Sequence, residues 1–423
     1  MKKALLFILC LGTMLLTSCV HEYSRSASVP NREKPIVWFN NQPANSLSGE
    51  LDMDALSFND KTWYVGNNAA QGAELQGQMV LDYLHAHGEG LDRNGDGIIG
   101  YVLLIGDIGH NDSIARTRGV RKALGTAVPD SVQGLTVIQD ADDIYSLPIG
   151  INLDGNSLHS VDGSITIDGV TYILRELASQ EMKSISGSTW DAATAANIFD
   201  TWSTSFGERI DVIVSNNDSM GMAVFNAWAR KNGVPVFGYD ANPDCVEAIV
   251  DGFAGTISQN ADIQAYMILH LIRNGLDGAD PMTGIAFPDE AGNVVPEGMF
   301  VFRSAERSFY ANSSIVNAEN AQDFADSFRP SPAFMHRLDR GETLPNRIWV
   351  DFPNNNDFYY NGTFAAQFSN YDDILNLELR IVRGDGLTES SVVDRLVNPQ
   401  DFEAFALLMI KKDNASAYIS RFR

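Results

Sequence analysis

The chain alternates short runs of apolar, β-branched and aromatic residues with longer stretches whose apolar residues recur at helical spacing. Near-continuous apolar strands between amphipathic helices are typical of parallel sheets covered by helices on both faces. The pattern therefore predicts an α/β protein. The predicted strands are 36–39, 101–105, 211–215, 234–238, 348–352, 377–382 and 404–410, and the predicted helices are 69–86, 113–124, 192–205, 220–231 and 263–274.

Three segments interrupt this alternation. Residues 20–33 are polar and rich in serine, which indicates a tether. Residues 141–185 contain three Asp-Gly pairs around two short β-like runs, a pattern that predicts an inserted β-hairpin. Residues 325–344 contain prolines and a glycine and are interpreted as an irregular linker.

The first residues have the composition of an export signal. Lys2 and Lys3 precede an apolar run that is too short to span a membrane, and the run ends in Leu-Thr-Ser-Cys19. Small residues before a cysteine are the pattern of a bacterial lipoprotein cleavage site. We therefore expect the segment 1–19 to act as a lipoprotein signal, with Cys19 lipidated and the protein anchored to the cell membrane on the periplasmic side. The alternative is an ordinary signal peptide that happens to contain a cysteine.

Composition narrows the class of protein further. The net charge of −24 argues against nucleic acid or an anionic membrane surface as a partner, and is compatible with a neutral ligand. Of the three cysteines, only Cys245 lies beyond Cys19, so no intramolecular disulfide is expected in the processed chain. Stability must then come from the core, and a chain of 423 residues with 44% hydrophobic content has room for two domains.

Polar side chains stand at the ends of several predicted strands. In open α/β sheets a ligand binds beyond the carboxyl ends of the strands. Each of these residues could instead cap a helix, but together they suit a ligand with many hydroxyl groups. The set comprises Asn40, His110, Asp112, Arg116, Asn217, Asp218 and Asp240.

A short acidic loop has the spacing of a calcium site. Asp92, Asn94 and Asp96 occupy positions one, three and five, and Ile98 would offer its carbonyl at position seven. Position nine is Gly100, which has no side chain, and position twelve is Leu103 instead of an acidic residue, so the remaining negative ligand must come from elsewhere. The alternative is a turn rich in Asx residues that binds no metal.

The segment DRNGDGIIGYVLLIGDIGHNDSIART (92–117) resembles galactose/glucose-binding periplasmic proteins, where it joins a calcium loop to a GHxDxxxR sugar-binding motif. RIDVIVSNNDSM, VPVFGYDA and AGTISQ resemble later segments of that family in the same order. The resemblance implies the type I periplasmic binding fold, in which two Rossmann-like lobes with parallel sheets are joined by a hinge. It also implies a set of roles for residues of this chain. Asn40, His110, Asp112, Arg116, Asn217, Asp240 and Gln259 would bind sugar hydroxyls, Trp190 would cover one face of the pyranose, and Asp211 would be the remote calcium ligand.

The opening segment of that family is absent before the VWFN strand, and similar segments occur at 347–368, 377–386 and 405–420. The chain is thus interpreted as a circular permutant in which residues 325–344 join the ancestral termini. On this interpretation Phe358 is the second stacking aromatic, and Asn356 and Asp357 supply polar contacts. The predicted organisation is lobe A from 34–62, 260–296 and 345–423, and lobe B from 63–259 and 297–324.

The resemblance implies a monomeric receptor, not an enzyme, that delivers glucose or galactose to the permease of an ABC transporter by closure of its lobes. A sugar sensor for a chemoreceptor would use the same closure. A sugar hydrolase remains a third alternative, because Asp112 and Asp240 could form a pair of carboxylates.

Overall fold

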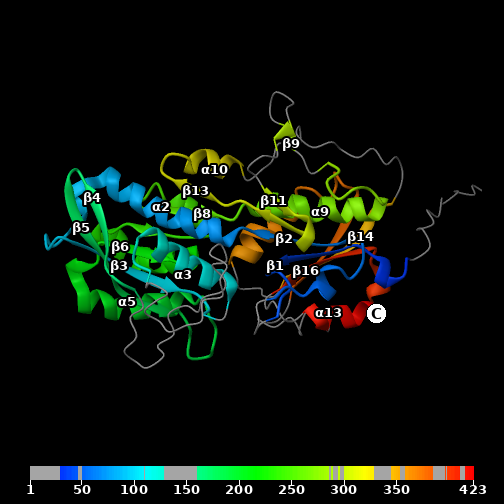
Figure 1. The fold of residues 1–423 in the computed structure, drawn as a ribbon, viewed down its shortest axis with the longest axis horizontal. Helices are drawn as coiled ribbons and strands as arrows, with labels where there is room; N and C mark the ends of the chain where they lie inside the picture. Colours follow the sequence, from blue (N-terminus) through cyan, green and yellow to red (C-terminus); the bar gives the residue numbers. More distant parts are fainter. Residues whose placement is uncertain are drawn as a thin grey trace, which may run out of the picture.

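The computed structural model describes residues 29–45, 50–108, 110–127, 160–284, 287–288, 294–295, 300–327, 344–352, 358–383, 396, 398–409 and 415–423. The molecule is elongated, and two α/β lobes lie side by side along its long axis (Figure 1). Each lobe is built on one sheet. The predicted fold class of two α/β lobes is therefore confirmed. Within the described part of the chain, no helix is both long and apolar enough to cross a membrane.

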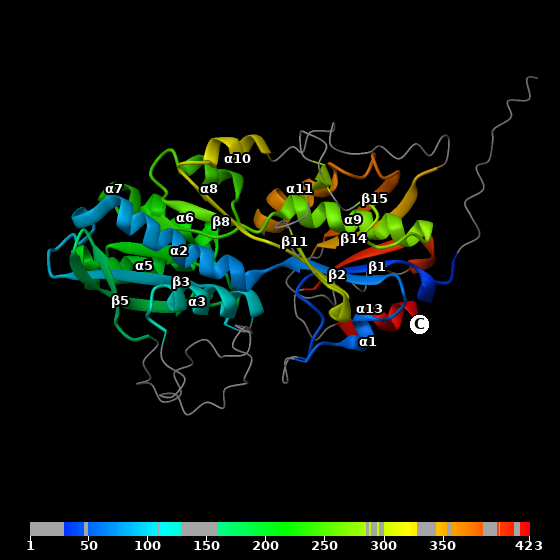
Figure 2. The ribbon, with the colours of Figure 1, turned by 45° about the horizontal axis from the view of Figure 1, so that its top comes forward.

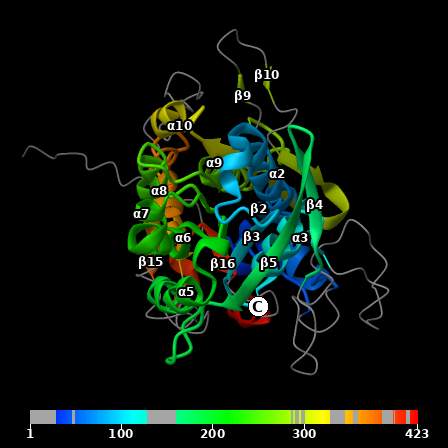
Figure 3. The same cartoon turned by 90° about the vertical axis from the view of Figure 1, so that its left-hand side faces the viewer.

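Lobe B has a sheet in the order β13-β8-β7-β6-β3-β5-β4. Its inner strands are parallel, and its two edge strands, β13 and β4, are antiparallel to their neighbours. Helices α2 and α3 cover one face, and α5, α6 and α8 cover the other (Figure 3). The strands are β3 (Ile98–Ile105), β4 (Gly163–Ile167), β5 (Val170–Glu181), β6 (Val212–Ser215), β7 (Val236–Phe237), β8 (Gly255–Ser258) and β13 (Ser314–Asn317); the helices are α2 (Ala69–His87), α3 (Asn111–Ala123), α5 (Ala192–Phe206), α6 (Asp218–Val224), α7 (Arg230–Asn232), α8 (Pro243–Ala248) and α10 (Ala321–Ser327).

Lobe A has a sheet in the order β11-β12-β2-β1-β16-β14-β15, parallel except for β11. One face packs against α9, the π-helix η7 and α11, and the other face packs against α1 and α13. The strands are β1 (Ile36–Asn40), β2 (Thr62–Asn67), β11 (Phe300–Arg303), β12 (Ser308–Ala311), β14 (Asn346–Phe352), β15 (Leu377–Arg383) and β16 (Ala404–Met409); the helical elements are α1 (Met53–Leu56), α9 (Ala261–Asp277), η7 (Tyr359–Phe364), α11 (Ala365–Phe368) and α13 (Ala415–Phe422). A separate short pair, β9 (Phe287–Pro288) and β10 (Val294–Val295), is antiparallel.

The C-terminal part of the chain completes the sheet that the N-terminal part begins. Strand β16 lies between β1 and β14 and is parallel to both, with Ile36 opposite Phe405 and Ile348 opposite Ala404. The predicted pairing of these three strands is confirmed. The first described helical turn, η1 (Asn31–Glu33), and the C-terminus lie at the same end of lobe A (Figures 1 and 2).

Along the described residues the chain passes from one lobe to the other after β2, after β8 and after β12, and it returns to lobe A between α10 and β14. Asn260, at the second crossing, has a left-handed backbone (φ 51°), and its amide donates to the carbonyl of Asn312 at the third crossing over 2.6 Å. This bond holds two of the connecting segments together.

The structure corrects several boundaries. Strand β2, which begins at residue 62, belongs wholly to lobe A, and so do β11 and β12 of the segment 297–324 that was assigned to lobe B. The predicted hairpin is present, but β5 pairs with β3 from Ile98 to Ile105 and is therefore a member of the main sheet, not an insertion. The predicted helix 220–231 is divided by a π-helical turn, η4 (Phe225–Ala229). The tether up to residue 28, residues 141–159 and most of the linker lie outside the described residues.

Candidate ligand site between the lobes

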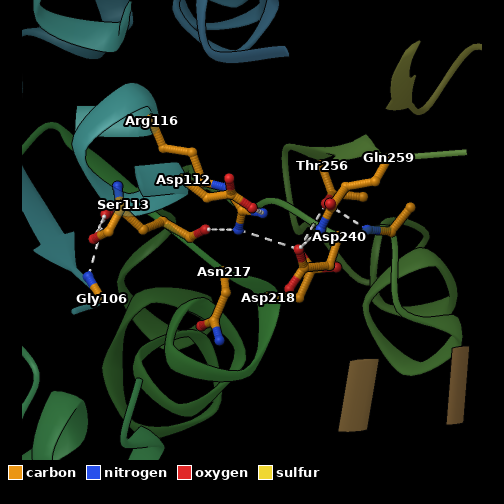
Figure 4. A network of polar contacts seen from close by, with 12 residues as sticks. Gly106, Asp112, Ser113, Arg116, Asn217, Asp218, Asp240, Thr256 and Gln259 are labelled. Atoms are coloured by element: carbon orange, nitrogen blue, oxygen red, sulfur yellow. Dashed lines mark hydrogen bonds and ion pairs between the residues drawn. The ribbon is translucent and has the colours of Figure 1, made fainter. Parts of the chain in front are cut away.

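A buried arginine forms the centre of the site. Nη1 of Arg116, on α3, donates to the carboxylate of Asp240 over 3.2 Å and to the carbonyl of Asn216 over 2.7 Å, while Nη2 lies 3.6 Å from Asp112 (Figure 4). Arg116 is 3% exposed, and its guanidinium lies over the ring of Tyr239, 3.8 Å from the centroid. Burial opposes the charge, but the carboxylates of Asp240 and Asp112 outweigh it and raise the pKa of Arg116. The arginine therefore stays charged in the interior.

The backbone turn at Asp240 is fixed by hydrogen bonds to the neighbouring carboxylate of Asp218. Asp240 and the following Ala241 have positive φ angles of 116° and 51°, which non-glycine residues adopt only under constraint. The carboxylate of Asp218 accepts hydrogen bonds from the backbone N–H of Asn242 and from the hydroxyl of Thr256, each over 2.7 Å (Figure 4). Burial raises the pKa of Asp218 to about 7. Asp218 therefore positions the Asp240 turn instead of facing the site.

Gln259 joins the same network. Its amide nitrogen donates to Oδ1 of Asp240 over 2.6 Å, the oxygen that also accepts from Arg116. Asp112, Arg116, Asp240 and Gln259 are thus brought together by α3, the end of β7 and the end of β8, as the carboxyl-end rule predicts. These polar groups can bind a ligand through charge-assisted hydrogen bonds.

Trp190 and His110 form the aromatic side of lobe B. Their rings meet edge to face, with centroids 5.7 Å apart. The Trp190 ring lies so close to Gly106 that a Cβ there would come within 2.4 Å of it, so only glycine permits this placement. Nδ1 of His110 accepts from the N–H of Asp112 and caps α3. His110 is therefore both a helix cap and a side chain of the site.

Two neighbouring asparagines follow β6 and have different roles. Asn217 caps α6, because its oxygen accepts from the N–H of Met220 over 3.0 Å, and it remains 9% exposed. Asn216 is fully buried and accepts hydrogen bonds from the N–H of Gly106 and from the hydroxyls of Ser113 and Thr117. Asn216 thus ties three elements together beneath the site, a role the sequence analysis missed although the residue lies in the same run.

Asn40 uses its side chain within lobe A. Its amide donates to the carbonyl of Met409 over 2.8 Å, and its oxygen accepts from the hydroxyl of Tyr360 over 2.9 Å. The next residue, Asn41, reaches lobe B instead, where its amide nitrogen lies 3.0 Å from Nε2 of His110. In this structure Asn41 is the residue of this loop that makes the cross-lobe contact.

A second contact joins the lobes on the other side of the site. The hydroxyl of Thr363, on η7 in lobe A, donates to the side chain of Asn242 in lobe B over 2.7 Å, and both are buried. Thr363 and Asp240 also line one small cavity of about 50 Å³. Neither Thr363 nor Asn242 was predicted, because a lone Thr or Asn in a sequence carries no signal of its partner.

The residues predicted from the opening segment of the family are described only in part. Phe358 lies directly before η7 and is 43% exposed. Asn356 and Asp357 lie outside the described residues. The predicted sandwich of Trp190 and Phe358 therefore stays a prediction.

The acidic loop is closed by its own hydrogen bonds. Asp92 accepts from the N–H groups of Gly95, Asp96 and Gly97, and Asp211 accepts from those of Arg93 and Gly100. Among the described residues, no three or more Asp, Glu, His or Cys side chains gather as they would around a metal ion. Oxygen donors suit calcium, and a carboxylate oxygen that accepts an N–H retains lone pairs. Calcium binding through Asp92, Asn94, Asp96, Ile98 and Asp211 stays a prediction.

Two lobes, each built on a largely parallel sheet, thus bring polar side chains together between them. Models of the periplasmic binding protein domain match residues 153–280 and residues 345–415. Over these two segments the chain is similar to periplasmic binding proteins, and its two α/β lobes have the arrangement of the type I fold.

Two curated relatives are similar over part of the chain. It is 26% identical over 257 residues to the D-galactose/methyl-galactoside binding periplasmic protein MglB of Haemophilus influenzae. The aligned region covers 59% of each chain. It is 31% identical over 99 residues to a xylitol-binding protein of Mycolicibacterium smegmatis, covering 23% of this chain and 28% of the other. The chain thus spans about three fifths of the length of the first relative and less of the second.

Among solved structures, a periplasmic solute-binding protein of an ABC transporter from Actinobacillus succinogenes, with bound D-allose, is similar with a TM-score of 0.41 and 17% identity. The match covers 68% of this chain and 71% of that chain.

Proposed function

We propose that the protein is a receptor for a neutral hexose, glucose or galactose, that releases its ligand to the permease of an ABC transporter. The buried network of Arg116, Asp240 and Gln259 carries this proposal, since its donors and acceptors suit vicinal hydroxyl groups. Trp190 offers a flat apolar surface for the C–H face of a pyranose. The similarity to a protein that binds D-galactose and methyl-galactoside supports the same class of ligand.

Isothermal titration calorimetry tests this proposal. We expect glucose or galactose to bind at a single site, and Trp190→Ala to weaken that binding about tenfold or more through loss of the stacking surface. Trp190→Phe, which keeps an aromatic face, should recover part of the affinity. Binding of an amino acid in the absence of any sugar binding would contradict the proposal.

The placement of Asp112 and Asp240 favours a binding protein over a hydrolase. Asp112 and Asp240 both contact the guanidinium of Arg116, so neither stands as an acid or base opposite the other. A hydrolase needs one carboxyl to donate a proton and a second carboxylate to act as base or nucleophile. Incubation with glucosides and galactosides should therefore yield no free hexose.

The anchoring, the location and the role in transport are part of the same proposal. We infer a lipoprotein held at the periplasmic face of a membrane through Cys19, on the sequence pattern given above. Replacing Cys19 by serine should move the protein from the membrane fraction to the soluble fraction. A sensor for a chemoreceptor would use the same binding site. A binding measurement with the purified permease distinguishes the transport role from the sensor role.

We also propose that the chain is a circular permutant. Strands β14, β15 and β16 come from the last part of the chain, yet in the sheet they lie directly beside β1, the first described strand. The two ends of the chain thus form one uninterrupted block of parallel strands. A parallel sheet depends on which strands pair, and cutting or joining the chain elsewhere costs only loop-closure entropy. A rearranged protein that begins near residue 344 and joins 423 to 34 by a short linker should therefore fold and bind the same sugar.

A further inference from the structure

Tyr359, the first residue of η7, has a buried hydroxyl group that is unpaired. The side chain is 7% exposed, and its oxygen has no hydrogen-bond partner among the described residues. Leaving a buried hydroxyl unpaired costs about 1–3 kcal/mol, and native proteins contain few such groups. The hydroxyl of Tyr359 therefore needs a partner that the described chain does not supply.

This hydroxyl faces the charged part of the site. Thr363, one turn further along η7, bonds to Asn242 of lobe B and lines a cavity with Asp240, so this face of η7 adjoins the Asp240 turn. Burial raises the pKa of Tyr359, and the charges of Asp240 and Arg116 act on it in opposite directions. The phenol is therefore neutral at physiological pH and can donate a hydrogen bond.

A second unpaired donor lies in the same region, on the opposite lobe. Nε of Arg116 is buried and has no partner, although both terminal nitrogens of the same guanidinium are engaged. Tyr359 and Arg116 thus bring two unsatisfied donors to the site from the two lobes. An oxygen of a bound ligand is the acceptor that such donors lack.

Two other tyrosines near the site differ from Tyr359 in their surroundings. The hydroxyl of Tyr360 donates to Asn40 in its own lobe. The hydroxyl of Tyr239 is also buried without a hydrogen-bond partner among the described residues, but it belongs to lobe B and packs against α2, where a Cβ at Gly72 would come within 2.1 Å of it. Of these three, Tyr359 is the one whose buried and unpaired hydroxyl belongs to lobe A and lies within the electrostatic reach of charged groups of lobe B.

We propose that the hydroxyl of Tyr359 is a specificity-determining ligand contact, which donates a hydrogen bond to one hydroxyl group of the bound sugar. The inference rests on the proposed function, since it requires a polyhydroxylated ligand in this site. Because Tyr359 belongs to lobe A and Arg116 to lobe B, a ligand that satisfies both donors links the two lobes.

The test compares Tyr359→Phe with Tyr360→Phe. Each variant removes one hydroxyl and keeps the ring, but Tyr360 contacts Asn40 and serves as the matched control. Calorimetry with glucose, galactose and their monodeoxy analogues should show a loss of about tenfold or more for Tyr359→Phe with the preferred sugar. For one deoxy analogue the wild type and Tyr359→Phe should bind equally, whereas Tyr360→Phe should leave the ranking of the analogues unchanged.

The outcomes separate the two proposals. If the wild type binds a hexose and Tyr359→Phe binds all analogues as the wild type does, the hydroxyl has no ligand contact and this inference is wrong. A uniform loss for every analogue, accompanied by a lower Tm, would assign Tyr359 a structural role and would also overturn it. If the wild type binds another polyhydroxylated ligand, the same comparison is made with its deoxy analogues, and if it binds none, the proposed function itself fails.

Discussion

Arg116 and Asp240 form an ion pair of 3.2 Å in which the two side chains are 4% and 6% exposed. The pair joins α3 to the turn after β7, two elements 124 residues apart in sequence. Its guanidinium also lies over Tyr239, and its carboxylate also accepts from Gln259. One pair of charges therefore fixes most of the polar groups that lobe B presents to a ligand.

Asp240→Asn should lower both stability and affinity. Removing one partner of a buried ion pair leaves the other charge uncompensated, which typically costs about 3–5 kcal/mol. The contact of Arg116 with Asp112 will offset part of this cost. Denaturant unfolding measures the change, and Asp251→Asn is the matched control because the Arg230–Asp251 pair is half exposed. Equal effects of the two variants would contradict the role assigned to the buried pair.

Thr363→Val should weaken ligand binding without an equal loss of stability. The variant keeps the shape of the side chain but removes the hydrogen bond to Asn242 between the lobes, worth about 1 kcal/mol or a fivefold change in affinity. Thr117→Val is the control, because Thr117 bonds to Asn216 within lobe B. Thr363→Val should mainly lower the affinity measured by calorimetry, whereas Thr117→Val should mainly lower the Tm measured by thermal unfolding. A Thr363→Val protein that binds sugar as the wild type does would exclude a role for this bond in closure.

Stability should fall as the pH rises, because of Asp218. Burial raises the pKa of its carboxyl from the ordinary 3.8 to about 7 in the folded protein. The folded state therefore binds this proton more tightly than the unfolded chain, so the contribution is fully present below about pH 4 and is lost as the pH rises through 7. The loss amounts to at most about 4 kcal/mol.

Denaturant unfolding between pH 4 and pH 8 measures this effect as the difference between the wild type and Asp218→Asn, which cannot titrate at this position. Relative to the variant, the wild type should lose stability with rising pH. Parallel curves would show that Asp218 does not titrate in this range.

The calcium prediction is decided by metal analysis and melting. If the loop binds calcium, protein purified without chelator should carry about one ion, and chelation should lower the Tm. Asp96→Asn should weaken this effect, because it removes a negative oxygen ligand. A Tm that does not respond to chelator would show that the hydrogen bonds to Asp92 and Asp211 are sufficient to hold the loop.

Much of the architecture could be predicted from the chain alone. The strands around residues 36, 101 and 404 were found because buried parallel strands are continuous apolar runs, a local property. Their pairing was predicted only through the resemblance to a family whose strand order is known. Strand β5 was misjudged because Asp-Gly turns indicate a hairpin but carry no information on whether its second strand joins a larger sheet.

For the site, the sequence by itself determined the residues that act near their own strand ends. Asp112, Arg116 and Asp240 follow strands, and parallel strands bring such ends together. The tertiary structure decided the rest. Asn40 proved to be bonded within lobe A while Asn41 reaches His110, and Thr363 and Tyr359 meet lobe B only because η7 packs against the Asp240 turn. The physical reason is that hydrogen-bond partners are chosen by the relative placement of two lobes, and no local pattern of residues encodes that placement.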